Sequence, residues 1–207
     1  MAGTPTTLED GIVVKGGDLI RIRTGGAFEI DTIRVNMFAG RMFWIDSGGD
    51  VTVTDLTDLS GNGFSVRAIG ASASIRMKWR LGLTIQDTSQ TAISGATVTI
   101  TDSDGSEVSG SPFTTDANGE ITEQALTYRH YFTDADSNVT NKVYDPYTVQ
   151  ISASGYITQT HKITMDEKKD LVFTLEASNK WIAPQGDTVY QNLDQTNAHN
   201  KFNWEEV

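Results

Sequence analysis

Polar and apolar residues alternate with a period of two along most of the chain between residues 11 and 175. Residues 75–80 are a clear example, because Ile75, Met77 and Trp79 alternate with basic residues. Successive side chains of a β-strand point to opposite faces, so this period is typical of half-buried strands and not of helices. The sequence therefore predicts an all-β protein with less than about a tenth of its residues in helix.

Short alternating runs fill residues 11–80, and glycine-rich segments such as Gly25-Gly26 and Gly61-Asn62-Gly63 separate them. Glycine pairs between strand-like runs are turn signals. We expect a small N-terminal β-barrel or β-sandwich here, preceded by a polar N-terminal arm over residues 1–10. In residues 75–80 the alternation predicts one buried face and one face that presents basic side chains.

The middle segment, residues 81–176, contains three recognisable pieces: Ile-Ser-Gly-Ala-Thr-Val-Thr-Ile from Ile93, Thr-Asp-Ala-Asn-Gly-Glu-Ile from Thr115, and Tyr-Thr-Val-Gln-Ile-Ser-Ala-Ser-Gly-Tyr from Tyr147. Together they resemble the carboxypeptidase regulatory-like domain, a transthyretin-like (Ig-like) β-sandwich related to the Cna protein B-type repeats. The resemblance implies a spacer, an adhesive stalk unit or a partner-binding domain, and it offers no catalytic residues. The residues that we expect between its two sheets are Val98, Ile100, Val149, Ile151, Tyr156, Phe173 and Leu175.

Residues 122–144 are longer than a hairpin loop requires. Loops above about 12–15 residues are usually functional or disordered. We therefore expect a long loop here that makes an accessory contact.

Strand alternation stops at residue 177, and residues 177–207 are rich in asparagine and glutamine. Large aromatic residues are the ones most enriched at protein interfaces. We therefore expect an extended C-terminal arm that docks on another subunit, although a flexible tail with incidental aromatics fits the same composition. The expected interface residues are Trp181, Tyr190, Phe202 and Trp204.

Charge is distributed unevenly over the 207 residues. Residues 1–80 hold 9 Lys/Arg and 9 Asp/Glu, whereas residues 81–207 hold 7 and 18, so the second part carries the whole net charge of −11. Nucleic-acid affinity depends on Lys and Arg that neutralise phosphates, so no direct nucleic-acid partner is expected. Apolar runs are too short to span a membrane, so no membrane partner is expected, and the absence of cysteine excludes disulfides and thiolate metal sites.

No constellation typical of catalysis is present. The three histidines are isolated, and neither a Gly-x-Ser-x-Gly motif nor a phosphate-binding loop occurs. We therefore predict a protein that is not an enzyme, with no catalytic residues and no bound transition metal. Asp102 and Asp104 are the only weak candidates for a metal, which would be calcium, but the twelfth position of an EF-hand-like loop starting at Asp102 is Phe113 and not glutamate. A plain turn is the simpler interpretation.

Function must then be inferred from architecture. Two β-domains, flanking arms, no cysteine and no secretory signal at the N-terminus favour a structural protein of a bacteriophage virion, such as a capsid decoration (cement), neck or tail component. Such a protein would assemble through its N-terminal domain and arms as a homo-oligomer, bind other subunits of a symmetric particle and display the acidic sandwich. A bacterial cell-surface adhesive or carbohydrate-binding module, with a surface glycan as partner, is the alternative. An accessory domain of an enzyme is a third class.

Overall fold

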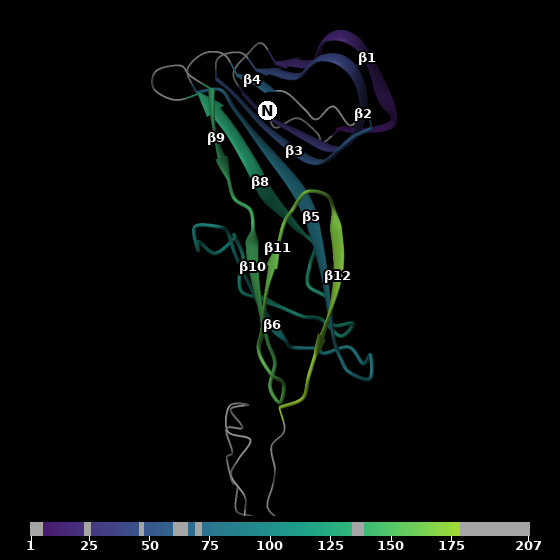
Figure 1. The fold of residues 1–207 in the computed structure, drawn as a ribbon, viewed down its shortest axis with the longest axis vertical. Helices are drawn as coiled ribbons and strands as arrows, with labels where there is room; N and C mark the ends of the chain where they lie inside the picture. The colour runs from purple at the N-terminus through teal and green to yellow at the C-terminus, as the bar shows by residue number, and fades with distance from the viewer. Residues whose placement is uncertain are drawn as a thin grey trace, which may run out of the picture.

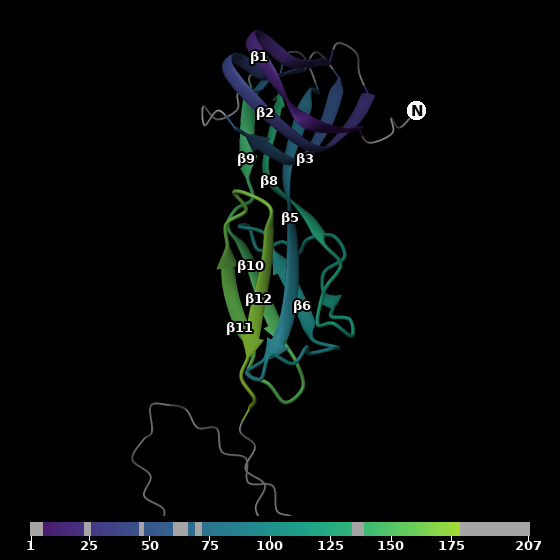
Figure 2. The ribbon, with the colours of Figure 1, turned by 90° about the vertical axis from the view of Figure 1, so that its right-hand side faces the viewer.

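The computed structural model describes residues 6–22, 26–45, 48–59, 66–68, 72–133 and 139–178. Every element in these residues is a β-strand, and none is a helix, which confirms the predicted all-β class. No helix there is long and apolar enough to cross a membrane. The molecule is elongated, with β1 to β4 at one end and the sandwich strands at the other (Figures 1 and 2). The strands are β1 (Thr6–Ile22), β2 (Gly26–Ile45), β3 (Gly49–Asp58), β4 (Val66–Ala68), β5 (Ser74–Asp87), β6 (Thr97–Thr101), β7 (Phe113–Thr114), β8 (Gln124–Thr133), β9 (Val139–Val143), β10 (Tyr147–Ser152), β11 (Gln159–Ile163) and β12 (Lys169–Leu175).

The N-terminal strands stack in parallel, one above the next. Residues of β2 pair with residues 23 positions later in β3, as Gly26 does with Gly49. Residues of β3 pair with residues 24 positions later in β5, as Asp50 does with Ser74. β1 pairs with β2 in the same parallel sense, with register shifts. The chain therefore winds in successive turns of about 23 residues, and we call each turn a coil. We define the coil stack as β1 to β4 together with residues 74–78 of β5.

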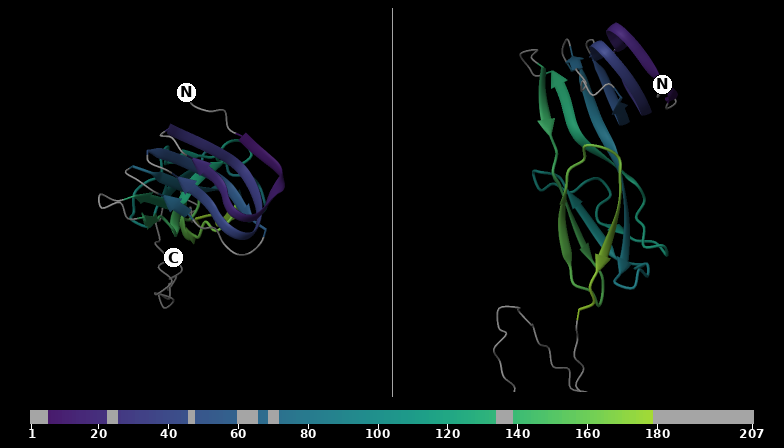
Figure 3. Two further views of the ribbon diagram at one scale, coloured as in Figure 1. Left: turned by 90° about the horizontal axis from the view of Figure 1, so that it is seen from above. Right: turned by 45° about the vertical axis from the view of Figure 1, so that its right-hand side comes forward.

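Parallel pairing at a nearly constant offset places residues of successive coils in columns. One column contains Ile30, Val53 and Met77, and a second contains Val51 and Ile75. Val53, Met77, Val51 and Ile75 are all buried, within one hydrophobic cluster. The coil stack therefore builds its core by placing apolar side chains on top of one another from coil to coil, as Figure 3 shows for the stacked ribbons.

This arrangement corrects two expectations for the N-terminal part. The barrel alternative is wrong: in the described residues β1 pairs only with β2, so the sheet stays open. Residues 6–10 belong to β1 and not to an arm. The physical reason is that backbone groups hold β1 to β2 in a ladder, which does not require an apolar side chain at every second position.

The sandwich consists of two facing sheets. β12, β5 and β8 provide one of them and belong to the eight-stranded sheet that also contains β1 to β4 and β9, whereas β11, β10, β6 and β7 form a separate four-stranded sheet. β12 pairs in parallel with the second half of β5, so the last strand of the sandwich lies beside its first strand. Of the residues expected between the sheets, five are buried and two, Tyr156 and Phe173, are half-buried against the same cluster. The five buried ones are Val98, Ile100, Val149, Ile151 and Leu175.

β5 belongs to both parts of the molecule. Its residues alternate between half-buried and buried along nearly the whole strand. Ile75 and Met77 pack into the core of the coil stack, and Trp79, Leu81 and Leu83 pack into the core of the sandwich. The boundary expected between residues 80 and 81 thus lies inside an uninterrupted strand.

The expected long loop over residues 122–144 is wrong. β8 and β9 form an antiparallel hairpin here, and β8 also pairs antiparallel with β5 from Ser74 to Leu81. Leu126 is buried in the sandwich, whereas Tyr131 packs against the coil stack. The hairpin is therefore long because it reaches from one hydrophobic core to the other.

Candidate functional site at the junction of the two parts

The junction between the coil stack and the sandwich is organised around the Arg80 side chain, which is 23% exposed. Its Nη2 donates to both carboxylate oxygens of Asp31, at 2.6 and 2.7 Å, and its Nη1 donates to Oδ2 of Asp55. Its Nε lies 3.3 Å from Oε2 of Glu123. One guanidinium thus joins β2 and β3 of the coil stack to the segment that leads into β8.

Asp55 is positioned by an unusual backbone. It has a φ of 53°, and Thr32, which lies 23 positions earlier in the preceding coil, has a φ of 52°. Left-handed backbone is uncommon outside glycine, and aspartate is among the residues that tolerate it best. Asp55 is buried, and its Oδ1 accepts a hydrogen bond from the backbone N–H of Arg80 at 2.9 Å. The same left-handed position in β2 and in β3 therefore brings a polar side chain to Arg80, at the place where β5 leaves the stack.

These contacts have a common electrostatic effect. The hydrogen bond to Asp31 is the largest influence that raises the pKa of Arg80, with Asp55 also raising it and burial opposing both. Lys168, whose Nζ lies 2.7 Å from Oε1 of Glu123, extends the network into the segment before β12. The junction network, which we define as Arg80, Asp31, Asp55, Glu123 and Lys168, therefore connects both parts through ion pairs.

A cleft of about 830 Å³ opens beside this network. Trp79 and Tyr128 stack in its wall, with ring centroids 6.2 Å apart and an angle of 26° between the planes. Asp145, also in the wall, accepts a hydrogen bond from the backbone N–H of Met165 at 3.1 Å. Burial raises the pKa of Asp145 above its ordinary value. The cleft combines charges of both signs with an aromatic pair, a lining suited to a polar ligand.

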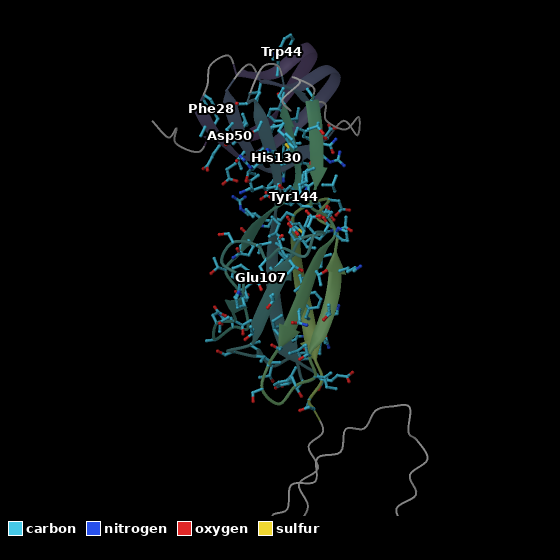
Figure 4. All side chains as sticks on the ribbon, turned by 90° about the vertical axis from the view of Figure 1, so that its left-hand side faces the viewer. Phe28, Trp44, Asp50, Glu107, His130 and Tyr144 are labelled. Carbon is cyan, nitrogen blue, oxygen red and sulfur yellow. The ribbon has the colours of Figure 1, made fainter. Side chains whose placement is uncertain are left out.

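A second polar cluster lies on the outer face of the sheet that β5 shares. Arg76 Nη1 donates to Oδ1 of Asp50 at 2.6 Å, and the Ser74 hydroxyl donates to the same oxygen. His130 faces Arg76 across the β5–β8 pair and is close enough to Asp50 for that charge to act on it; Figure 4 labels both residues. Burial lowers the pKa of His130, and the charge of Arg76 lowers it further. The predicted basic face of residues 75–80 is therefore confirmed, with its arginines in ion pairs.

The two metal candidates lie in a turn between β6 and β7. Asp102 Oδ1 accepts hydrogen bonds from the backbone N–H groups of Asp104 and Ser106, at 2.9 and 3.0 Å. Oδ2 of Asp104 lies 2.7 Å from Nζ of Lys142. No three His, Cys, Asp or Glu side chains in the described part of the chain come together in a way that could hold a metal ion. Both carboxylates are thus occupied by protein groups.

The expected interface residues Trp181, Tyr190, Phe202 and Trp204 lie outside the described residues, and the docking arm stays a prediction. The junction network was missed by sequence reasoning, although Arg80 was noted as part of a polar face. A recurring spacing of 23 residues, seen in Gly17, Gly40 and Gly63, was the available signal for the coils. Repeats of 20–50 residues are typical of solenoid architectures.

Comparison with known proteins supports the sandwich. Residues 81–166 match the family model described as SpaA, prealbumin-like fold domain. This confirms the sandwich fold inferred from the three sequence pieces, for less than half of the chain. No curated protein matches.

Solved structures overlap only weakly. The Bacillus anthracis TIE protein shares 18% identity over 56% of this chain, with a TM-score of 0.35, and the overlap spans a fifth of that protein (20%). A 3-chlorocatechol 1,2-dioxygenase from Rhodococcus opacus shares 11% sequence identity, and the overlap covers 48% of this chain and 59% of the dioxygenase, with a TM-score of 0.31. The major pilin subunit BcpA of Bacillus cereus shares 20% sequence identity, and the overlap covers 48% of this chain and 28% of the pilin, with a TM-score of 0.23.

Proposed function

We propose that this protein is a non-catalytic structural component of a bacteriophage virion, in which the coil stack serves as a rigid stem and displays the sandwich. The observation that carries the proposal is the uninterrupted path of β5 through both cores. A strand that is hydrogen-bonded on both sides in each part leaves no flexible linker at the junction. The position of the sandwich is therefore fixed by that of the stem.

Three further features support a rigid display unit. The junction network ties β2, β3 and the segment before β8 to a single guanidinium, and Lys168 ties the segment before β12 to Glu123 of the same network. The β8–β9 hairpin pairs with β5 and contributes to both cores. The molecule is elongated, and its two parts lie end to end (Figure 1). Such a shape suits a protein that holds one domain away from its point of attachment.

A bacterial cell-surface adhesive is the second candidate. The match of residues 81–166 to the SpaA family model favours it, because transthyretin-like sandwiches resembling this one serve as adhesive stalk units. In that setting the junction cleft would face a surface glycan, and the stem would play the same mechanical part.

Immunogold electron microscopy separates the two settings. Antibodies raised against the full chain would be applied to purified virions from the source and to intact bacterial cells. Gold at a fixed position on the particle, such as the capsid, neck or tail, is the expected result. Gold confined to the cell envelope would replace the virion proposal with the adhesive, and an absence of gold on both would contradict each of them.

A further inference from the structure

The two ends of the coil stack differ in whether another strand covers the last coil. At the β5 end, β8 and β9 pair antiparallel against the last coil, and β9 is only five residues long. Lys142 lies on β9, where it forms an ion pair with Asp104. Short edge strands, bulges and lysines are the devices by which proteins prevent sheet edges from pairing with other chains. This end is closed to further strands.

The opposite end is β1, which pairs only with β2 among the described residues. In a parallel ladder the residues of a strand direct their backbone N–H and C=O groups alternately to one neighbour and the other. β1 has 17 residues, and the register of its ladder with β2 shifts at four places, so the ladder is regular over residues 12–14 and 18–22. In these stretches alternate residues direct their backbone groups to the side on which no described strand lies. Such free stretches of an edge strand are a template for another strand.

The partner strand must also offer a long free edge. The other edge strands in the described part of the chain are much shorter than β1: β7 has two residues, β4 has three, β9 and β11 have five each, and β12 has seven. β1 of a second copy matches in length. Two identical edges pair under a two-fold axis, which makes the strands antiparallel and closes the assembly at two copies.

Charge favours the same contact. β1 contains Glu9, Asp10 and Asp18 against Lys15 and Arg21, so it is close to neutral, whereas residues 81–207 carry the net charge of −11. Like charges brought together oppose association. Joining two copies at β1 keeps the acidic sandwiches at the far ends of the dimer, since the sandwich lies at the other end of the molecule from β1 (Figure 2).

We infer that the free edge of β1 is the surface through which two copies of this chain pair, so that their coil stacks form one continuous sheet across a two-fold axis. The inference deepens the proposed structural role by naming its self-association surface. It holds equally in a virion or on a cell surface, so its failure is distinguishable from a failure of the immunogold experiment.

Sedimentation velocity and light scattering of the full-length protein test the inference. The expected mass is twice the 22.6 kDa of one chain. Val13→Pro and, separately, Val14→Pro provide a matched pair, because proline has no N–H and adjacent residues of β1 direct their N–H groups to opposite sides. One of the two variants should be a monomer whose melting temperature no longer rises with protein concentration. The other should remain a dimer, but it loses a backbone hydrogen bond to β2 and should melt at a lower temperature than the wild type.

Val172→Lys, on the exposed outer side of β12, is the control and should leave the dimer intact. A monomeric wild-type protein at tens of micromolar would overturn the inference. So would a trimer, or a dimer that survives both proline substitutions.

Discussion

The coil stack and the sandwich are built from the same alternation of polar and apolar residues, yet they bury their apolar faces differently. In the coil stack, residues about 23 positions apart lie in parallel columns, as Ile30 and Val53 do. In the sandwich, antiparallel strands such as β6 and β10 form a second sheet that covers the first. The difference shows that alternation determines which face of a strand is buried but not which strand lies beside it.

β5 shows that one strand can satisfy both arrangements. Its first half has β3 on one side and β8 on the other, and its second half has β12 as a parallel neighbour. The buried face continues without a break from Met77 to Trp79, where one core gives way to the other. We therefore expect the two parts to unfold together and to move as one body.

The largest effect is expected from a charge placed in either core. Val149→Asp, between the two sheets, and Val53→Asp, in the coil stack, each put an unpaired carboxylate at a position with 0% exposure. Each should cost several kcal/mol of unfolding free energy. Because β5 links the cores, each variant should still show one thermal transition by calorimetry, at a lower temperature.

Val172→Asp is the control for both, since Val172 is 59% exposed, and its effect should stay within about 0.5 kcal/mol. Two separate transitions in either core variant would show that the coil stack and the sandwich unfold independently.

A smaller loss is expected at the turn between β7 and β8. Gly119 has a φ of 75°, and a Cβ added there would lie 2.3 Å from the backbone oxygen of Ile85. Gly119→Ala should therefore cost more than the 1–2 kcal/mol or so of left-handed backbone strain alone. Gly105 has a φ of 82° but open space around it, so Gly105→Ala should show only the strain. If urea unfolding shows that Gly119→Ala and Gly105→Ala lose the same unfolding free energy, the close approach of residue 119 to Ile85 does not matter for stability.

Removal of the Arg80 charge should affect the junction. Arg80→Met leaves the buried carboxylate of Asp55 without its cation and should cost about 2 kcal/mol, less than a fully buried pair because Arg80 is partly exposed. Hydrogen exchange should then increase at the amides of β3 and of residues 79–81. Lys168→Met is the control, since Lys168 touches only the exposed Glu123 end of the network. An unchanged exchange pattern in Arg80→Met would contradict the structural role of the network.

The smallest effect concerns pH. Burial, together with the charge of Arg76, lowers the pKa of His130, while Asp50 opposes the shift and Lys142 adds to it. The unfolded chain therefore binds a proton on this residue at a higher pH than the folded protein does. The contribution of the neutral His130 to the free energy of unfolding is complete above the ordinary histidine pKa of about 6.5. It is lost as the pH falls from there toward the lowered pKa of the folded state. His130→Gln should flatten this part of the curve of melting temperature against pH, and an unaltered slope would contradict the assignment.

The sandwich could be predicted from sequence because its turns have specific signatures. Asp87, Asp102 and Asp116 each accept hydrogen bonds from the backbone N–H groups two and four residues later. Two of the three turns place glycine at the left-handed position that follows, Gly105 and Gly119. Such local chemistry is visible in the residues themselves.

The coil stack and the junction could not be predicted in the same way. Parallel pairing joins residues 23 or 24 positions apart, so its signal in the sequence is the repeated spacing of Gly17, Gly40 and Gly63, which no local turn chemistry accompanies. The contacts of Arg80 join residues up to 49 positions apart, and no local pattern indicates them. The strands of residues 124–143 resembled a loop because their partner, β5, lies far away in sequence.

A distance distribution across the junction tests the central claim, that β5 makes the coil stack and the sandwich one rigid body. The chain has no cysteine, so Glu29→Cys on β2 and Thr160→Cys on β11, both exposed, allow two spin labels to be placed without background. Double electron–electron resonance should give a single narrow intramolecular distribution when the labelled chain is diluted with unlabelled protein. A broad or multimodal distribution would show that the two parts move independently, and it would contradict the account.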